Sequence, residues 1–201
     1  MPIKLNSTGG GSITIDVPNM STANTLTLPG ITGNVITSSD SNTVTQSMIS
    51  RSGFYGGFGP AFEAYLSGST QALTTSATWY KVTLNAESYD TASCFDSTTN
   101  YRFTPNVAGY YHIIAQSYID YSTTSPIRMR LSVYKNGVGT KETIVTQPSA
   151  IYGTLNMSNL IYMNGTTDYL EMYSLQQGGS GAYLIAGSAY TFMSGYLARP
   201  A

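Results

Sequence analysis

The sequence predicts an all-β fold, and three observations carry this prediction. Charged residues make up only 9% of the 201 residues, against roughly 25% in an average globular protein, so helices with charged faces are unfavoured. Gly (20 residues) and Tyr (17 residues) are abundant, which suits short strands joined by polar turns. Alternation of apolar and polar residues recurs along the chain, whereas no long segment shows clean helical periodicity. We therefore expect antiparallel strands connected by turns.

The composition also narrows the function classes. The formal net charge is −1 and no basic cluster is visible, so we expect no binding of nucleic acid. No apolar run approaches the ~20 residues of a membrane span. The single cysteine, Cys94, has no intrachain disulfide partner and is expected to be a small buried residue. The N-terminus runs directly into polar residues, so no signal peptide is expected.

Residues 1–53 are predicted to form a β-rich attachment segment and linker. Alternating strands are expected at 12–17, 25–29 and 33–37, followed by a short helix at 43–50. Each strand is too short to bury a core alone. Several chains wound together would share their apolar faces, which indicates an oligomeric stem or docking segment. A flexible polar tail is the alternative.

Residues 54–201 are predicted to form a head domain, because strand signals recur there at the spacing of a β-sandwich. The glycines and the proline of 53–60 mark its boundary. A loop is expected at 88–100, and tight turns are expected at 135–137 and 164–165. The expected strands are 62–66, 79–84, 101–104, 110–119, 127–134, 142–147, 153–163, 168–176 and 189–198.

One stretch organises this head. Tyr101 and Phe103 alternate with polar residues, as in a strand, and Pro105 ends that strand because it cannot donate to a sheet. Gly109 is expected to permit a turn that a residue with a Cβ would resist. Residues 110–115 form a nearly continuous apolar run, which predicts a strand buried in the sandwich core.

The tyrosines allow two interpretations. A tyrosine offers apolar area and a hydroxyl together, which fits a wet contact surface. Alternatively, most of them pack in the core and in subunit contacts. Binding residues are common on loops held by a rigid scaffold, and the glycine-rich segment 176–183 is expected to be such a loop. Four tyrosines in or near predicted loops are candidates for ligand contact, with stacking on sugar rings as one mechanism: Tyr89, Tyr121, Tyr152 and Tyr183.

Catalytic motifs are absent from the sequence. His112 is the single histidine and lies within a predicted core strand, so we expect a packed or interface residue and not a catalytic base. One histidine and one cysteine supply too few of the usual ligands for zinc. A Ser-His-Asp triad has no nucleophile-elbow pattern to support it. The chain is therefore predicted not to be an enzyme and to carry no cofactor.

Calcium is the one metal that the sequence leaves open. Asp90, Asp96 and Asp120 lie in or beside predicted loops that would meet at one end of a sandwich, and Ca²⁺ takes carboxylate and carbonyl oxygens. No EF-hand spacing is present, and ordinary solvated turn residues are the favoured interpretation.

Other charged residues are expected to have structural roles. Arg128 and Arg130 share one strand face, where like charges repel unless they are exposed or paired with a carboxylate such as that of Glu171. Asp168 is expected to serve its own turn.

Four blocks, in this order and spacing, resemble a known superfamily: residues 62–66, residues 101–105 followed by 109–111, residues 160–170 and residues 192–197. Residues about 60–199 are similar to the trimeric jelly roll shared by the globular head of the first complement component and by tumour necrosis factor. The resemblance implies an antiparallel jelly-roll sandwich that forms a homotrimer around a threefold axis. It also implies roles in the core or in trimer packing for Tyr110, Tyr111, His112, Phe192 and Tyr196.

Residues 1–53 resemble segments of tailed-bacteriophage fibre and virion-surface proteins. This resemblance implies a virion structural protein, made in the host cytoplasm and released by lysis, that docks on capsid or tail proteins through residues 1–53. Its head would stabilise the capsid or bind a host-surface glycan or protein. A short fibre and a capsid decoration both fit. The alternatives are a receptor-binding tail fibre, a free secreted lectin-like or cytokine-like module and, third, a glycan-degrading enzyme.

Overall fold

The computed structural model describes residues 3–6, 9, 12–15, 59–121, 127–147, 152–178 and 181–201. The chain divides into two units, Met1–Met48 and Ile49–Ala201. The predicted strands at 25–29 and 33–37 and the predicted helix at 43–50 lie outside the described residues.

The first unit contains an antiparallel hairpin. Strand β1 (Ile3–Asn6) pairs with β2 (Ser12–Ile15), with Ile3 opposite Ile15. Strand β2 falls within the strand expected at 12–17, whereas β1 was not predicted. Because residues 1–4 were interpreted only as the start of a polar segment, the short apolar–polar alternation of β1 was missed.

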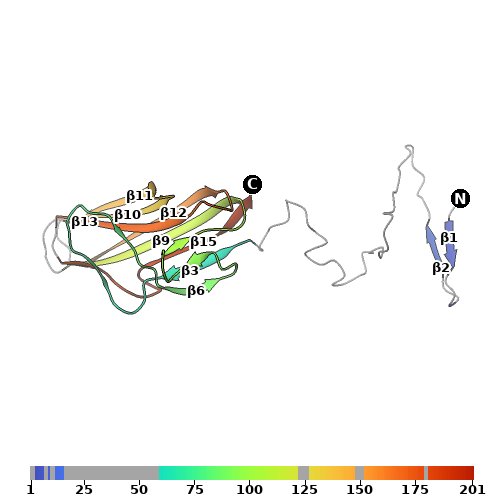
Figure 1. Ribbon diagram of the computed structural model, residues 1–201, viewed down its shortest axis with the longest axis horizontal. Coiled ribbons are helices and arrows are strands. Elements are labelled where there is room, and N and C mark those ends of the chain that lie inside the picture. The colour runs from blue at the N-terminus through green and yellow to red at the C-terminus, as the bar shows by residue number, and fades with distance from the viewer. Residues whose placement is uncertain are drawn as a thin grey trace. The chain divides into compact units, whose positions relative to one another are not determined.

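The second unit is an antiparallel jelly-roll sandwich, as predicted, with two sheets facing each other (Figure 1). The six-stranded sheet has the order β11-β10-β13-β8-β7, and β5 also pairs with β13. Its strands are β5 (Tyr80–Lys81), β7 (Phe95–Asp96), β8 (Arg102–Phe103), β10 (Ile127–Lys135), β11 (Val138–Gln147) and β13 (Leu170–Gln177).

The seven-stranded sheet has the order β4-β14-β9-β15-β3-β6, and β12 pairs with the other edge of β9. Its strands are β3 (Ala61–Tyr65), β4 (Gln71–Leu73), β6 (Ala86–Asp90), β9 (Gly109–Tyr121), β12 (Tyr152–Met163), β14 (Ala182–Leu184) and β15 (Phe192–Pro200). No α-helix occurs in the part of the chain that the structure describes. Accordingly, none of the described segments is a helix that is long and apolar enough to span a membrane.

The core lies between the two sheets and is built by side-chain alternation. Every second residue of β9 is buried, which places Tyr111 and Ile113 inside. The ring of Phe62 stacks on that of Phe103 at 4.2 Å and on that of Phe95 at 5.3 Å. The aromatic residues of the first two resembling blocks therefore meet in one cluster, which ties the two sheets together.

Two glycines are required by close packing. A Cβ on Gly195 would lie 2.6 Å from Ile113 Cδ1 and 3.1 Å from a ring carbon of Phe62. A Cβ on Gly109 would collide with the backbone oxygen of Arg199 in the neighbouring strand. Gly109 begins β9 and does not form the turn that the sequence suggested. Its role is to let two strands approach each other.

Several predicted elements were wrong in detail. The strand expected at 79–84 is reduced to the two residues of β5, although Val82 and Leu84 are buried. The loop expected at 88–100 contains β7 and overlaps the end of β6. Strand β6 is an edge strand whose residues are exposed or half-buried. It pairs with its neighbour through backbone hydrogen bonds, but it lacks the apolar–polar alternation by which a strand is predicted from the sequence.

The turns agree well with the sequence. Asn136 and Gly137 both have positive φ, 54° and 78°, and join β10 to β11 as a hairpin, which confirms the turn expected at 135–137. Asp168 accepts hydrogen bonds from the Asn164 backbone N–H at 3.0 Å and from Asn136 Nδ2 at 2.7 Å. It therefore serves its own turn, as predicted, and the neighbouring hairpin as well.

The ion pairs differ from the prediction. Arg130 pairs with Glu142 on β11, and Glu171 pairs with Lys81 on β5 at 2.5 Å. The pairing of Glu171 with the arginines of β10 was therefore wrong. Glu171 lies directly opposite Tyr134 in the register of β13 and β10, four residues away from Arg130 along that strand.

Candidate functional site

The outer face of the seven-stranded sheet carries an unusual number of exposed aromatic side chains. Because β9 alternates, its even-numbered residues point away from the core. The exposed fractions of three large side chains on this face are 57% for Tyr152, 56% for Leu160 and 50% for Tyr196. We call this surface the aromatic face and define it as Tyr110, His112, Tyr118, Tyr152, Leu160, Tyr162, Tyr190 and Tyr196.

One half of the aromatic face lies where β9 begins. The rings of Tyr110 and Tyr162 are 5.4 Å apart, and the rings of His112 and Tyr196 are also 5.4 Å apart. Lys135 Nζ donates to the backbone oxygen of Tyr162 at 2.7 Å and lies 5.5 Å from the centre of its ring. The three strands β12, β9 and β15 thus contribute to one continuous group of rings.

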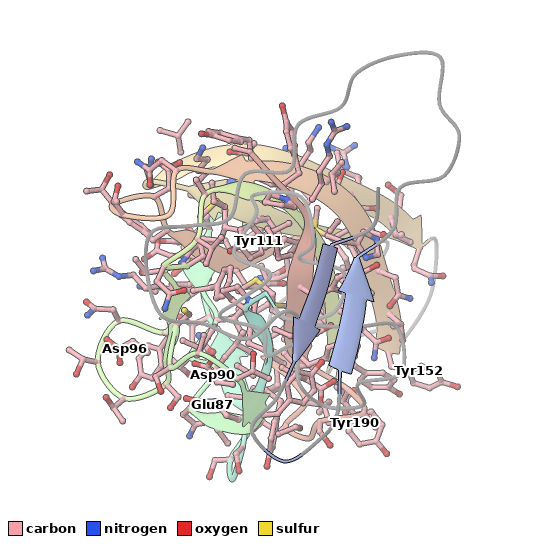
Figure 2. The ribbon with its side chains drawn as sticks, turned by 90° about the vertical axis from the view of Figure 1, so that its right-hand side faces the viewer. Glu87, Asp90, Asp96, Tyr111, Tyr152 and Tyr190 are labelled. Carbon is pink, nitrogen blue, oxygen red and sulfur yellow. The ribbon has the colours of Figure 1, made fainter. Side chains whose placement is uncertain are left out.

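The other half lies towards the end of β9. Tyr118 stacks on Tyr152 at 6.1 Å, with an angle of 11° between the rings, and meets Tyr190 at 5.6 Å. Tyr152 and Tyr190 are labelled on the same side of the molecule in Figure 2. Gln116 Nε2 donates to the backbone oxygens of Ala189 at 2.8 Å and of Tyr190 at 3.0 Å, which fixes the turn that carries Tyr190.

His112 has one hydrogen-bond partner on this face. Its Nε2 atom lies 2.7 Å from Ser158 Oγ on the neighbouring strand. Its Nδ1 atom is buried and has no hydrogen-bond partner. A hydroxyl next to a histidine is one part of a catalytic triad, but no carboxylate of the described residues contacts Nδ1 to orient the ring. Among the described residues, His112 and Ser158 form a pair and not a triad.

The residues predicted for the core or for trimer packing separate into two groups. Tyr110, His112 and Tyr196 lie on the aromatic face, and Phe192 is half-buried beside them on β15. Tyr111 is fully buried between the sheets, as Figure 2 shows. Its hydroxyl donates to the Val107 backbone oxygen at 2.8 Å, and burial raises its pKa.

The four tyrosines predicted in ligand-contacting loops all lie on strands. Tyr89, Tyr152 and Tyr183 are exposed, on β6, β12 and β14. Tyr121 is buried, with an exposed fraction of 4%, and burial raises the pKa of its hydroxyl. The prediction for Tyr121 was wrong because β9 continues past the expected end at 119, and its alternation directs Tyr121 inward.

The aspartates considered for calcium are separated. Asp90 accepts backbone hydrogen bonds from Ala92 at 3.2 Å and Phe95 at 2.7 Å. Asp96 accepts them from its own turn, first of all from Thr99, and these bonds hold the pKa of Asp96 well below its usual range. Asp120 lies opposite Tyr152 in the sheet. In Figure 2, Asp90 and Asp96 both lie away from Tyr152 and therefore away from Asp120. Within the described ranges, no three His, Cys, Asp or Glu residues are placed to hold a metal ion.

Sequence reasoning missed four members of the aromatic face: Tyr118, Leu160, Tyr162 and Tyr190. A signal was present, because residues 160–163 are all apolar although the strand is buried on only one face. A strand with apolar residues on both faces is typical of a sheet that is covered on both faces. The run therefore predicts that a partner covers the outer face of this sheet. Strand β9 also has apolar residues on both faces, because the even-numbered neighbours of the buried Tyr111 and Ile113 are largely apolar.

Comparisons with known proteins bear on the fold. No protein-family model matches the chain, and no curated protein matches it. Among solved structures, murine APRIL is 11% identical, with a TM-score of 0.51, over 69% of this chain and 98% of APRIL. The globular domain of zebrafish complement 1qA protein is 16% identical, with a TM-score of 0.49, over 71% of this chain and 99% of that one.

A third solved structure, Eiger TNF from S. frugiperda, is 14% identical to the chain, with a TM-score of 0.47. The likeness covers 71% of this chain and 95% of that one. The likeness to APRIL supports the jelly-roll fold that the strand order shows.

Proposed function

We propose that this protein is a non-enzymatic virion structural protein of a bacteriophage, a homotrimer whose subunits meet through the aromatic face. The observation that carries the trimer is that both faces of β9 and β12 bear large apolar side chains, while the second face has no cover within the described head. Large exposed apolar patches on soluble proteins mark sites of interaction.

The chemistry of the aromatic face favours a permanent protein contact. Tyrosines bury apolar area and keep a hydroxyl for a partner, and they are enriched in the centres of interfaces. The eight residues that define this face carry tyrosine hydroxyls and one imidazole but no carboxylate or ammonium group. Charged residues lie at its two ends, with Asp120 opposite Tyr152 and Arg199 opposite Tyr110. Closed symmetric assembly would hide the same face on each copy. The resemblance to the complement and tumour necrosis factor heads favours three copies.

The virion role is supported by the N-terminal segment. Its Gly-Gly-Gly-Ser-Ile-Thr-Ile, Thr-Leu-Thr-Leu-Pro-Gly and Thr-Gly-Asn-Val-Ile-Thr pieces resemble parts of tailed-bacteriophage fibre and virion-surface proteins. A trimer also suits a threefold position on a capsid.

Locating the protein on intact particles tests this role. Antibody against the head, coupled to gold and viewed by electron microscopy, should label the capsid or a short projection on it. Labelling of the tail tip would support the alternative of a receptor-binding tail fibre. Complete absence of label from purified particles, with the protein present in the culture medium, would contradict the virion role and favour a free binding module.

A further inference from the structure

His112 places a titratable side chain on the aromatic face. It is the single histidine of the chain and lies half-buried on the outward side of β9. In the register of the sheet it is directly opposite Leu160 of β12 and Tyr196 of β15. The imidazole is the side chain that ordinarily changes its charge between about pH 8 and pH 5. Mild acid therefore adds a positive charge to a face that otherwise consists of tyrosines and a leucine.

The hydrogen bonds of His112 suit a neutral ring. Nε2 lies 2.7 Å from Ser158 Oγ, and a hydroxyl can either donate to this nitrogen or accept from it. Nδ1 is buried and has no hydrogen-bond partner among the described residues. A protonated ring carries an N–H donor on both nitrogens. Protonation therefore creates a charged group with a buried donor that lacks an acceptor, which costs free energy.

The charged groups around the ring do not compensate for this cost. They are two cations and two carboxylates: Arg199, Lys135, Glu63 and Asp168. Arg199 lies opposite Tyr110, the next outward residue of β9, and repels a positive ring. Lys135 lies 5.5 Å from the centre of the Tyr162 ring and is paired with Asp168. Glu63 is on β3, which β15 separates from β9, so it lies about 10 Å away across the sheet.

We infer that His112 is a pH-dependent switch of the assembly: the trimer holds while the ring is neutral and opens when the ring gains a proton. The inference rests on the proposed trimer and its packing through the aromatic face. In a free subunit this face is open to water, so the half-buried ring can change its rotamer and bring Nδ1 to solvent. Between subunits the ring is enclosed, and a proton that it takes up stays without solvent or a counter-charge.

The direction of the effect follows from proton linkage. Because the free subunit takes up a proton at His112 more readily than the trimer does, acid favours dissociation. An imidazole in water takes up its proton near about pH 6.5. The contribution of the neutral ring to assembly is therefore fully present above this pH and is lost as the pH falls below it. Three copies, each contributing about tenfold, raise the trimer dissociation constant by up to about 10³-fold between pH 7.5 and pH 5.5.

Sedimentation of the full chain with fluorescence detection, over a dilution series at pH 7.5 and at pH 5.5, tests the switch. Free Asp and Glu side chains take up their protons near about pH 4, so a change over this range reports on the single histidine. We expect a trimer at pH 7.5, and at pH 5.5 a dissociation constant that is higher by about 10²- to 10³-fold. Far-ultraviolet circular dichroism at both pH values establishes that the dissociated subunits remain folded.

His112→Gln is the matched variant, because glutamine is uncharged at both pH values and keeps a polar group within reach of Ser158. It should form a trimer whose dissociation constant is nearly the same at pH 7.5 and pH 5.5. His112→Leu supplies a second neutral side chain, with the same expected result, where the glutamine variant does not assemble at pH 7.5. Ser158→Ala leaves the imidazole in place and should keep the response to pH.

The outcomes separate this inference from the proposed trimer. A wild-type trimer whose dissociation constant is unchanged or lower at pH 5.5 overturns the switch and leaves the trimer standing. A response to pH that persists in both neutral variants overturns the assignment to His112. A wild-type protein that is monomeric at pH 7.5 overturns the proposed trimer and the switch together.

Discussion

Lys135 and Asp168 form an ion pair, with 2.8 Å between Nζ and Oδ2, that joins two turns from distant parts of the chain. Lys135 ends β10, and Asp168 follows β12. Asn136 strengthens the connection, because its Nδ2 donates to Asp168 and its Oδ1 accepts from the Tyr169 backbone N–H at 2.9 Å. Two hairpin turns are thereby held together by side-chain contacts as well as by the sheet.

This connection predicts a dependence of stability on pH. Burial raises the pKa of Asp168, but the hydrogen bonds from Lys135 and Asn136 outweigh it and hold the pKa below the usual value. Since the folded-state pKa is lowered, the contribution to stability is present above the unfolded pKa of about 3.9 and is lost as the pH falls through the folded pKa.

Asp168→Asn should therefore lower the free energy of unfolding at pH 7 by about 1–3 kcal/mol, and the difference from wild type should shrink below about pH 4. Urea unfolding at several pH values measures this. Glu87→Gln, at an exposed position on the edge strand β6, is the control and should change stability little. A difference for Asp168→Asn that stays constant from pH 7 to pH 3 would contradict the role of the carboxylate.

The close packing at Gly195 predicts that even one methyl group is not tolerated there. In Gly195→Ala the new Cβ meets Ile113 Cδ1 at 2.6 Å, the His112 backbone oxygen at 3.0 Å and a ring carbon of Phe62 at 3.1 Å. Overpacking of this kind costs about 1–3 kcal/mol, which chemical unfolding measures directly. Ser194→Ala, on the outward side of the same strand, should cost less than about 0.5 kcal/mol. Equal stabilities of the two variants would show that the core repacks freely.

Cys94 should be chemically protected in the folded protein. It is buried, with an exposed fraction of 6%, and its Sγ lies 3.5 Å from the Ala92 backbone oxygen. Burial raises the pKa of the thiol, so little of the reactive thiolate is present at neutral pH. A thiol reagent such as dithionitrobenzoate should react slowly with native protein and rapidly after unfolding in guanidinium. Equally rapid reaction in both states would mean that the core opens easily around β7.

The strands could be predicted where the apolar–polar pattern of the sequence matches the burial of the same residues in the folded protein. Residues 127–134 alternate strictly and are followed by Asn136-Gly137, and this segment forms β10 and its hairpin as expected. Strands β4 and β14 were missed, because each has three residues and owes its existence to pairing with distant partners. Such pairing depends on the whole sandwich and leaves no local pattern.

The sites were predictable only in part. Tyr110, His112 and Tyr196 were predicted to pack in the core or in the trimer, and they lie on the aromatic face of the described head. Alternation along β9 could have separated Tyr110 and His112 from Tyr111, which faces the core.

The central claim is that the aromatic face joins the subunits. Leu160 lies on this face with an exposed fraction of 56%, and Ile144 lies on β11 of the other sheet with an exposed fraction of 53%. A glutamate at position 160 would place an unpaired carboxylate inside the proposed interface, which costs several kcal/mol, whereas a glutamate at position 144 stays in water.

Sedimentation velocity of wild type, Leu160→Glu and Ile144→Glu at micromolar concentration is the most direct test. The account predicts a trimer for wild type and for Ile144→Glu, and a folded monomer for Leu160→Glu. A monomeric wild-type protein, or a trimer that persists unchanged in Leu160→Glu, would contradict it.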